Sequence, residues 1–198
     1  DYIEFGHGNG LGGSSLQYGF AADSDEDYMK AVRKRVKNAV LMSITIPGIG
    51  TRFEFEMMVR NGVEIARLAT QMSECDIAAE HVNMAKQLGL KPWLVLPTAS
   101  PLSVESTVHY AVLSEKLGAE VVYLLDGGGS MLPEQVFDRV SAMKKAIDIP
   151  IGIHAHNNLQ LAVANTVAAI DAGAEYVDCC VKGFGAGAGN CPVEPLVA

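Results

Sequence analysis

The chain has 198 residues, of which 23 are acidic and 15 are basic, so its formal net charge is -8. This length suits one domain or part of a larger one, and a hydrophobic content of 49% can fill a substantial core. The acidic balance argues against nucleic-acid binding, which needs a basic face. No apolar run reaches the ~18 residues of a membrane span, and no charged-then-apolar leader opens the sequence, so we expect neither membrane insertion nor export. Four cysteines are too few for a disulfide scaffold, which favours reduced thiols in the cytoplasm.

Short apolar runs alternate with longer helix-forming stretches along the whole chain. The expected strands are Tyr2–Gly6, Val40–Ile46, Glu64–Ala69, Pro92–Leu96, Val121–Leu125, Ile151–His154 and Tyr176–Val181. The expected helices are Asp25–Asn38, Arg52–Arg60, Asp76–Leu88, Ser103–Leu117, Pro133–Ile147 and Leu159–Ala172. Most of the strands are near-continuous apolar runs, which is typical of parallel strands that are covered on both faces.

A glycine recurs between the end of an expected helix and the start of the next strand. These glycines are Gly62, Gly89, Gly118 and Gly173, spaced 27, 29 and 55 residues apart. A glycine there suits the left-handed residue that ends a helix, and a period of about 28 residues indicates repeated βα units.

Three helix starts carry their own signals. Ser24 with Asp27, and Ser73 with Asp76, fit a capping box in which Asp replaces the usual Glu. Pro133 fits the first position of a helix, where its missing N–H costs nothing.

Seven parallel strands fit either a (β/α)8 barrel that lacks one unit or an open doubly wound sheet. The regular period favours the barrel. A complete barrel has about 250 residues, whereas this chain opens on a strand and ends just after one. We therefore expect an α/β fold of the TIM-barrel type without its first βα unit and its last helix. No linker or shift in composition marks a boundary, so residues 1–198 are expected to form a single incomplete domain.

In such a barrel the chemistry lies at the carboxyl ends of the strands. His154 and His156 end one strand, and residues i and i+2 share a face, so both imidazoles can meet one metal ion. A pair of hydrogen-bonded histidines lining a polar pocket is the alternative, and the spacing leaves it open. Asp126 ends the neighbouring strand, where it could join the metal, but its spacing favours a turn cap. His7 follows the first strand, where it either faces the pocket or organises a glycine loop.

Several motifs occur in the same order as in a known family, the 4-hydroxy-2-oxovalerate aldolases. The segments that resemble this family are Gly6–Ser15, Tyr18–Phe20, Pro47–Thr51, Met131–Pro133, His154–Asn158 and Gly185–Asn190. The wider superfamily includes hydroxymethylglutaryl-CoA lyase and isopropylmalate synthase, which share the barrel and the histidine pair.

The resemblance implies a lyase that uses a divalent metal to cleave 4-hydroxy-2-oxo acids into pyruvate and an aldehyde. The metal would be manganese, with zinc, cobalt or magnesium as alternatives, held by His154, His156 and, by analogy with the wider superfamily, Asn190. Candidate substrate contacts are His154, Ser130 and His7. The family also implies an oligomer, a small 2-oxo acid substrate, an acylating acetaldehyde dehydrogenase as partner, and a place in aromatic-hydrocarbon catabolism.

The sequence departs from the family in three places. The family has an N-terminal Arg that steadies the enolate, an adjacent Asp that ligates the metal and a following His that moves a proton. This sequence contains none of the three. The family's Asp-Ser-Ala-Gly motif is here Asp126–Gly129, which removes a substrate-binding hydroxyl that Ser130 is the candidate to replace. The C-terminal helical region, with its pocket tyrosine and dehydrogenase contact, is also missing. The alternatives are therefore an acyl-CoA lyase or Claisen-type acyltransferase of the same superfamily, or a non-catalytic fragment or paralogue.

Overall fold

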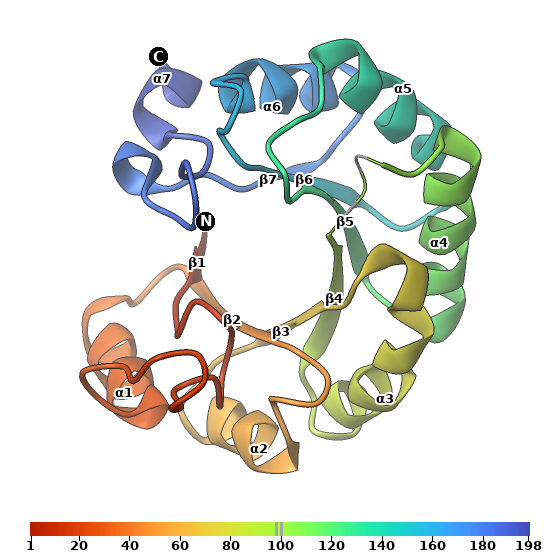
Figure 1. Ribbon diagram of the computed structural model, residues 1–198. Coiled ribbons are helices and arrows are strands. Elements are labelled where there is room, and N and C mark those ends of the chain that lie inside the picture. The colour runs from red at the N-terminus through yellow and green to blue at the C-terminus, as the bar shows by residue number, and fades with distance from the viewer. Residues whose placement is uncertain (98, 100) are drawn as a thin grey trace. The chain divides into compact units, whose positions relative to one another are not determined.

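The computed structural model describes residues 1–97, 99 and 101–198. Its strands are β1 Tyr2–Glu4, β2 Val40–Thr45, β3 Ile65–Ala69, β4 Lys91–Leu96, β5 Val121–Asp126, β6 Ile151–Ala155 and β7 Tyr176–Val177. Its α-helices are α1 Asp25–Arg35, α2 Arg52–Arg60, α3 Ala79–Gln87, α4 Val104–Leu117, α5 Pro133–Lys144, α6 Ala162–Asp171 and α7 Val193–Val197. Two 3-10 helices, η1 Met72–Ala78 and η2 Val181–Gly183, complete the elements (Figure 1).

The strands follow one another in the sheet in chain order, from β1 to β7. The pairs β1–β2, β2–β3, β5–β6 and β6–β7 are parallel, as the continuous apolar runs predict. Contacts divide the chain into two compact units, which are described separately. Unit 1 comprises Asp1–Thr70 and Asp76–Leu94, and unit 2 comprises Gln71–Cys75 and Val95–Ala198.

Unit 1 is built on β1, β2 and β3, with α1 and α2 in the chain between them and α3 after β3. Its buried side chains include Leu41, Phe55, Met58, Leu68 and Val82. Helix α2 begins at a complete capping box, in which Thr51 accepts from the first turn and the Glu54 carboxylate accepts from the Thr51 backbone N–H at 2.7 Å. Arg67 is buried on β3, and its Nη1 donates to Glu4 of β1 at 2.6 Å, which gives the buried cation an anionic partner.

Unit 2 contains β5, β6 and β7, which pair with one another in that order. In the β5–β6 register, Val122 lies opposite Ile151 and Asp126 lies opposite Ala155, so both strands end at the same edge. Helices α4, α5 and α6 lie side by side along these strands (Figure 1). Their apolar faces enclose a core that includes Leu96, Val122, Leu124, Val136, Val140, Met143, Ile151 and Ile153. This packing fixes the edge at which the histidine pair stands.

Most expected elements are confirmed within a few residues, and Gly62, Gly89, Gly118 and Gly173 all have the positive φ that the repeat predicts. Ser24 caps α1, and Pro133 is the first residue of α5. The expected cap at Ser73 is wrong, because a 3-10 helix spans Met72–Ala78 and α3 begins only at Ala79.

The last expected strand, Tyr176–Val181, is also wrong in length. β7 pairs with β6 only over Tyr176–Val177, because the next free carbonyl of β6, that of Ala155, accepts from the N–H of Cys191 instead of from the segment after β7. An isolated bridge joins Cys180 to Pro192. The segment 178–180 is therefore a connector between β7 and the glycine-rich loop.

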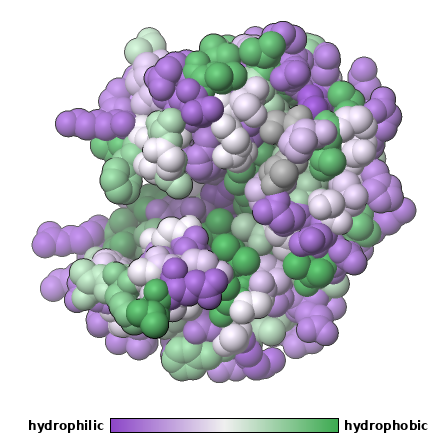
Figure 2. All heavy atoms as spheres, viewed as in Figure 1, coloured by the Kyte–Doolittle hydropathy of each residue, from purple (hydrophilic) through white to green (hydrophobic). Residues whose placement is uncertain are grey.

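Hydrophobic and hydrophilic residues are interspersed over the face of the molecule in Figure 2. Exposed large apolar side chains include Leu16, Phe20, Val181 and Phe184, and such exposure is ordinary for single residues. Among the helices of the described residues, none has both the length and the apolar character needed to cross a membrane.

Candidate metal centre

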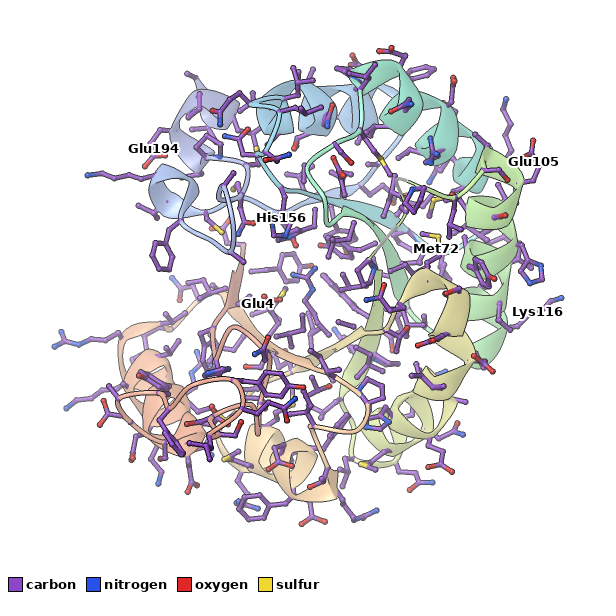
Figure 3. The ribbon with its side chains drawn as sticks, in the orientation of Figure 1. Glu4, Met72, Glu105, Lys116, His156 and Glu194 are labelled. Carbon is purple, nitrogen blue, oxygen red and sulfur yellow. The ribbon has the colours of Figure 1, made fainter. Side chains whose placement is uncertain are left out.

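The two histidines of the HxH pair lie side by side at the end of β6 in unit 2. Their ring centroids are 5.2 Å apart and the rings are tilted by 56°. Both side chains are half-buried. Figure 3 shows His156 on the inner side of this unit, whereas Glu105 and Lys116 project outward from α4. The structure therefore brings together the two imidazoles that the spacing predicts.

Asp178 fixes the orientation of the first histidine. Its Oδ2 lies 2.8 Å from Nδ1 of His154, and both side chains are largely shielded from solvent. A carboxylate that accepts from Nδ1 leaves Nε2 with its lone pair available to a ligand, which is the usual arrangement behind a metal-bound histidine. Sequence reasoning missed Asp178, because it falls within the expected strand Tyr176–Val181 and nothing in the sequence shows which side chain it contacts.

Burial favours the neutral form of the second histidine. Burial lowers the pKa of His156, and the nearby His154 lowers this pKa further. A hydrogen bond with the backbone of Ala186 and the charge of Asp126 act in the opposite direction but are smaller effects. A neutral imidazole is the form that binds a metal ion.

Asn190 faces the same site from the glycine-rich loop. It forms an antiparallel β-bridge with His156, and residues directly opposite in such a bridge point to the same face with Cβ atoms about 5 Å apart. Its Nδ2 donates to Sγ of Cys180 at 3.2 Å and to the carbonyl of Phe184 at 3.3 Å. A flipped amide would turn its oxygen toward the Phe184 carbonyl, so these contacts set the amide orientation.

The Oδ1 of Asn190 is buried and has no hydrogen-bond partner among the described residues. A buried acceptor without a partner costs about 1–3 kcal/mol, so its presence calls for a ligand. Two imidazole nitrogens and an amide oxygen suit a divalent first-row cation, and the chemistry of this donor set therefore fits a metal ion. Within the described part of the chain, no group of three His, Cys, Asp or Glu side chains joins them.

The glycines of the loop make room for this amide. A Cβ built on Gly185 would overlap the Nδ2, Cγ and Oδ1 atoms of Asn190, and one built on Gly189 would overlap the carbonyl of Gly183. The loop is thus glycine-rich because its own backbone and the Asn190 amide come close, one of the reasons for which glycine is used.

Asp126 caps the turn after β5, as its spacing predicts. Its buried carboxylate accepts from the backbone N–H of Ser130 at 3.1 Å and of Met131 at 3.0 Å. Ser130 itself is exposed. Gly129 in this turn has φ +56°, and an added Cβ would come within 2.6 Å of the Asn158 N and 2.8 Å of the His156 carbonyl oxygen. The turn is therefore packed directly against the segment that carries the histidines.

His7 lies in unit 1 and organises its own loop. Its Nδ1 accepts from the N–H of Asn9 at 3.1 Å, and its Nε2 lies 3.2 Å from the carbonyl oxygen of Gly19. The sequence allows His7 either to face the pocket or to organise the glycine loop, and these hydrogen bonds are those of a residue that organises the loop.

Comparison with known proteins agrees with these features. The model of the HMGL-like family matches residues 1–198. A 4-hydroxy-2-oxovalerate aldolase of Desulfitobacterium hafniense is 62% identical over 99% of this chain, and one of Carboxydothermus hydrogenoformans is 48% identical over 100% of it. The chain spans 59% of the length of each of these relatives.

Solved structures give the same fold. The N-terminal domain of a candidate aldolase from Bacteroides vulgatus matches with a TM-score of 0.82 at 22% identity, covering 100% of this chain and 66% of that one. The carboxyl transferase domain of Rhizobium etli pyruvate carboxylase matches with a TM-score of 0.80 at 16% identity, covering 88% of this chain and 32% of that one. The expected α/β class of the TIM-barrel type is thereby confirmed. With its whole length matched by the family model, the chain belongs to the HMGL-like family.

Proposed function

We propose that this chain carries the metal site of a divalent-metal-dependent aldolase, which cleaves 4-hydroxy-2-oxo acids such as 4-hydroxy-2-oxovalerate into pyruvate and an aldehyde. The observation that carries the proposal is the buried Oδ1 of Asn190, which has no hydrogen-bond partner among the described residues, on a residue that lies opposite His156 of the adjacent histidine pair. The name of the relative with 62% identity supports this choice among the reactions of the superfamily.

In this proposal His154, His156 and Asn190 hold the cation. A bound divalent cation would stabilise the negative charge that develops on the 2-oxo oxygen of the substrate as the C–C bond breaks. Asp178 at Nδ1 leaves Nε2 of His154 free for its ligand, and burial lowers the pKa of His156 and so favours its neutral imidazole. In this proposal, the metal ligands are therefore oriented and in the form that binds a cation before the substrate binds.

The finer assignments follow the family resemblance. We propose manganese as the cation and a small 2-oxo acid as the substrate, with contacts from His154 and Ser130. We further propose that the whole protein is a cytoplasmic oligomer that works with an acylating acetaldehyde dehydrogenase in aromatic-hydrocarbon catabolism.

The test measures pyruvate released from 4-hydroxy-2-oxopentanoate by the intact protein, after chelation and after addition of Mn²⁺. We expect release that depends on Mn²⁺ and falls at least about a hundredfold in the double variant H154A/H156A, since two of the donors are then gone. The matched control is H109A, because His109 is an exposed histidine on α4. Full activity in the double variant would contradict the metal assignment.

A second arm separates the related chemistries of the superfamily. Thermal melting is compared with pyruvate and with acetyl-CoA, each added with Mn²⁺. Stabilisation by pyruvate supports the aldolase, whereas stabilisation by the CoA ester alone favours an acyl-CoA lyase or acyltransferase. A protein that binds neither and releases no pyruvate would be a non-catalytic member of the family.

A further inference from the structure

The connector after β7 has one face toward the candidate site. Asp178 continues the pairing with β6 through a backbone bond to the Ile153 carbonyl at 3.0 Å, and Cys180 is extended, with φ -127° and ψ 147°. Residues i and i+2 of an extended segment share a face. Asp178 meets His154, and Cys180 meets the Asn190 amide, so this one face touches two of the proposed metal donors.

The intervening residue faces the other way. Cys179 packs against the cluster formed by Ala155, Ala162 and Cys191. Burial raises the pKa of the Cys179 thiol, with the neighbouring Cys191 as the next cause, which agrees with a side chain that is turned into the packed layer. Two adjacent cysteines thus lie in different surroundings, one beside the site and one behind it.

The contact with Cys180 matters because of the geometry of an amide. Asn190 has two amide hydrogens and one oxygen in a plane, so holding both hydrogens fixes where the oxygen points. Cys180 Sγ and the Phe184 carbonyl take the two hydrogens. With only the Phe184 carbonyl left, the amide could swing about that single bond, and Oδ1 would lose its fixed direction.

We propose that Cys180 is a positioning residue for the metal centre, which orients the Asn190 amide so that its Oδ1 is presented to the cation beside His154 and His156. This inference rests on the proposed function, since it assigns a role toward the same cation. Asp178 orients the histidine, and Cys180 orients the asparagine. The connector 178–180 then orients two donors from different parts of the chain.

The test titrates the intact, chelator-stripped protein with Mn²⁺ by calorimetry. Groups that orient metal ligands typically contribute 10–100-fold to affinity, and a thiol acceptor is at the weak end of this range. We expect C180A to weaken Mn²⁺ binding about tenfold. C180S should restore affinity to within about threefold of wild type, because a hydroxyl oxygen can accept the same amide hydrogen.

The matched control is C179A, which removes the same chemical group from the opposite face of the connector. Its affinity for Mn²⁺ should stay within about twofold of wild type, because its side chain touches neither donor. As a second readout, the visible absorption of bound Co²⁺ should change in C180A and not in C179A, since this band follows the ligands and their geometry. Circular dichroism confirms that each variant is folded.

The outcomes separate this inference from the proposed function. If wild type binds Mn²⁺ and H154A/H156A does not, while C180A binds as wild type does, the role of Cys180 is overturned and the metal site stands. Equal losses in C180A and C179A would also overturn it, since they would indicate general packing. If wild type itself binds no divalent cation, the proposed function fails and the inference fails with it.

Discussion

The carboxylate of Asp178 lies 2.8 Å from Nδ1 of His154, although 24 residues separate them in the chain. This contact joins the connector after β7 to the end of β6. In the variant D178N the anionic acceptor is lost, so His154 is less firmly oriented and its Nε2 is a weaker ligand. We expect Mn²⁺ affinity to fall by about 10–100-fold, as measured by calorimetry. D171N, which changes an exposed aspartate at the end of α6, should leave affinity unaltered.

The buried carboxylate of Asp126 holds the turn after β5 through two backbone N–H groups. D126A leaves both donors without this acceptor, and each lost bond of this kind costs about 1–2 kcal/mol. We expect the free energy of unfolding, from urea titration, to fall by about 2–4 kcal/mol. D126N keeps one acceptor oxygen and should lose roughly half as much. The exposed D138A should change stability by less than about 0.5 kcal/mol.

Gly129 and Gly187 allow conformational strain to be separated from crowding. Both have positive φ, +56° and +62°, but a Cβ would strike the backbone around His156 and Asn158 at Gly129 and would meet nothing within 4 Å at Gly187. G187A should therefore cost only the strain of about 1 kcal/mol. G129A should cost about 2–4 kcal/mol, because overpacking adds to the same strain. Urea unfolding of both variants checks the difference, and equal losses would contradict it.

Glu105 gives a pH dependence that is independent of the metal centre. A hydrogen bond from its own backbone N–H lowers the pKa of this carboxyl, and the side chain of Ser103, which caps α4, lowers it further. Because the folded pKa lies below the ordinary pKa of a glutamate carboxyl, the carboxylate stabilises the fold above that ordinary pKa, and this contribution is lost as the pH falls through the folded pKa.

The variant S103A removes one of these causes. We expect the pKa of Glu105 to rise toward its ordinary value and α4 to lose its cap, at a cost of about 1 kcal/mol. Carboxyl NMR titration of both proteins measures the first effect, and thermal unfolding at pH 7 measures the second. An unchanged Glu105 pKa in S103A would show that the backbone alone sets it.

The regular elements could be predicted because their causes are local. A glycine at the end of a helix, such as Gly118 with φ +95°, and a proline at the start of one, such as Pro133, act within a single turn. The cap at Ser73 failed because the chain there forms a 3-10 helix whose Met72 N–H bonds to the Pro97 carbonyl, a partner far along the chain. The length of β7 failed for the same reason, since the Ala155 carbonyl of β6 bonds to the N–H of Cys191, a residue of the later loop.

The candidate site could be predicted only in part. His154 and His156 could be found because their spacing follows from one strand. Asp178 and Cys180 could not be assigned, because their roles depend on the register of β7 against β6 and on a bridge that brings Asn190 opposite His156. A carboxylate or a thiol in a sequence gives no sign of which distant side chain it will orient.

The close approach of the Asn190 amide to Gly185 has a use in classifying related sequences. Any side chain there would occupy the volume of the Asn190 amide. A homologue with alanine or a larger residue at this position, even if it retains the asparagine, would have to place that amide elsewhere. Glycine at this position together with the asparagine therefore distinguishes two groups of homologues. Those with both residues can place the amide oxygen as a proposed metal ligand, and those without the glycine share the fold but not this placement.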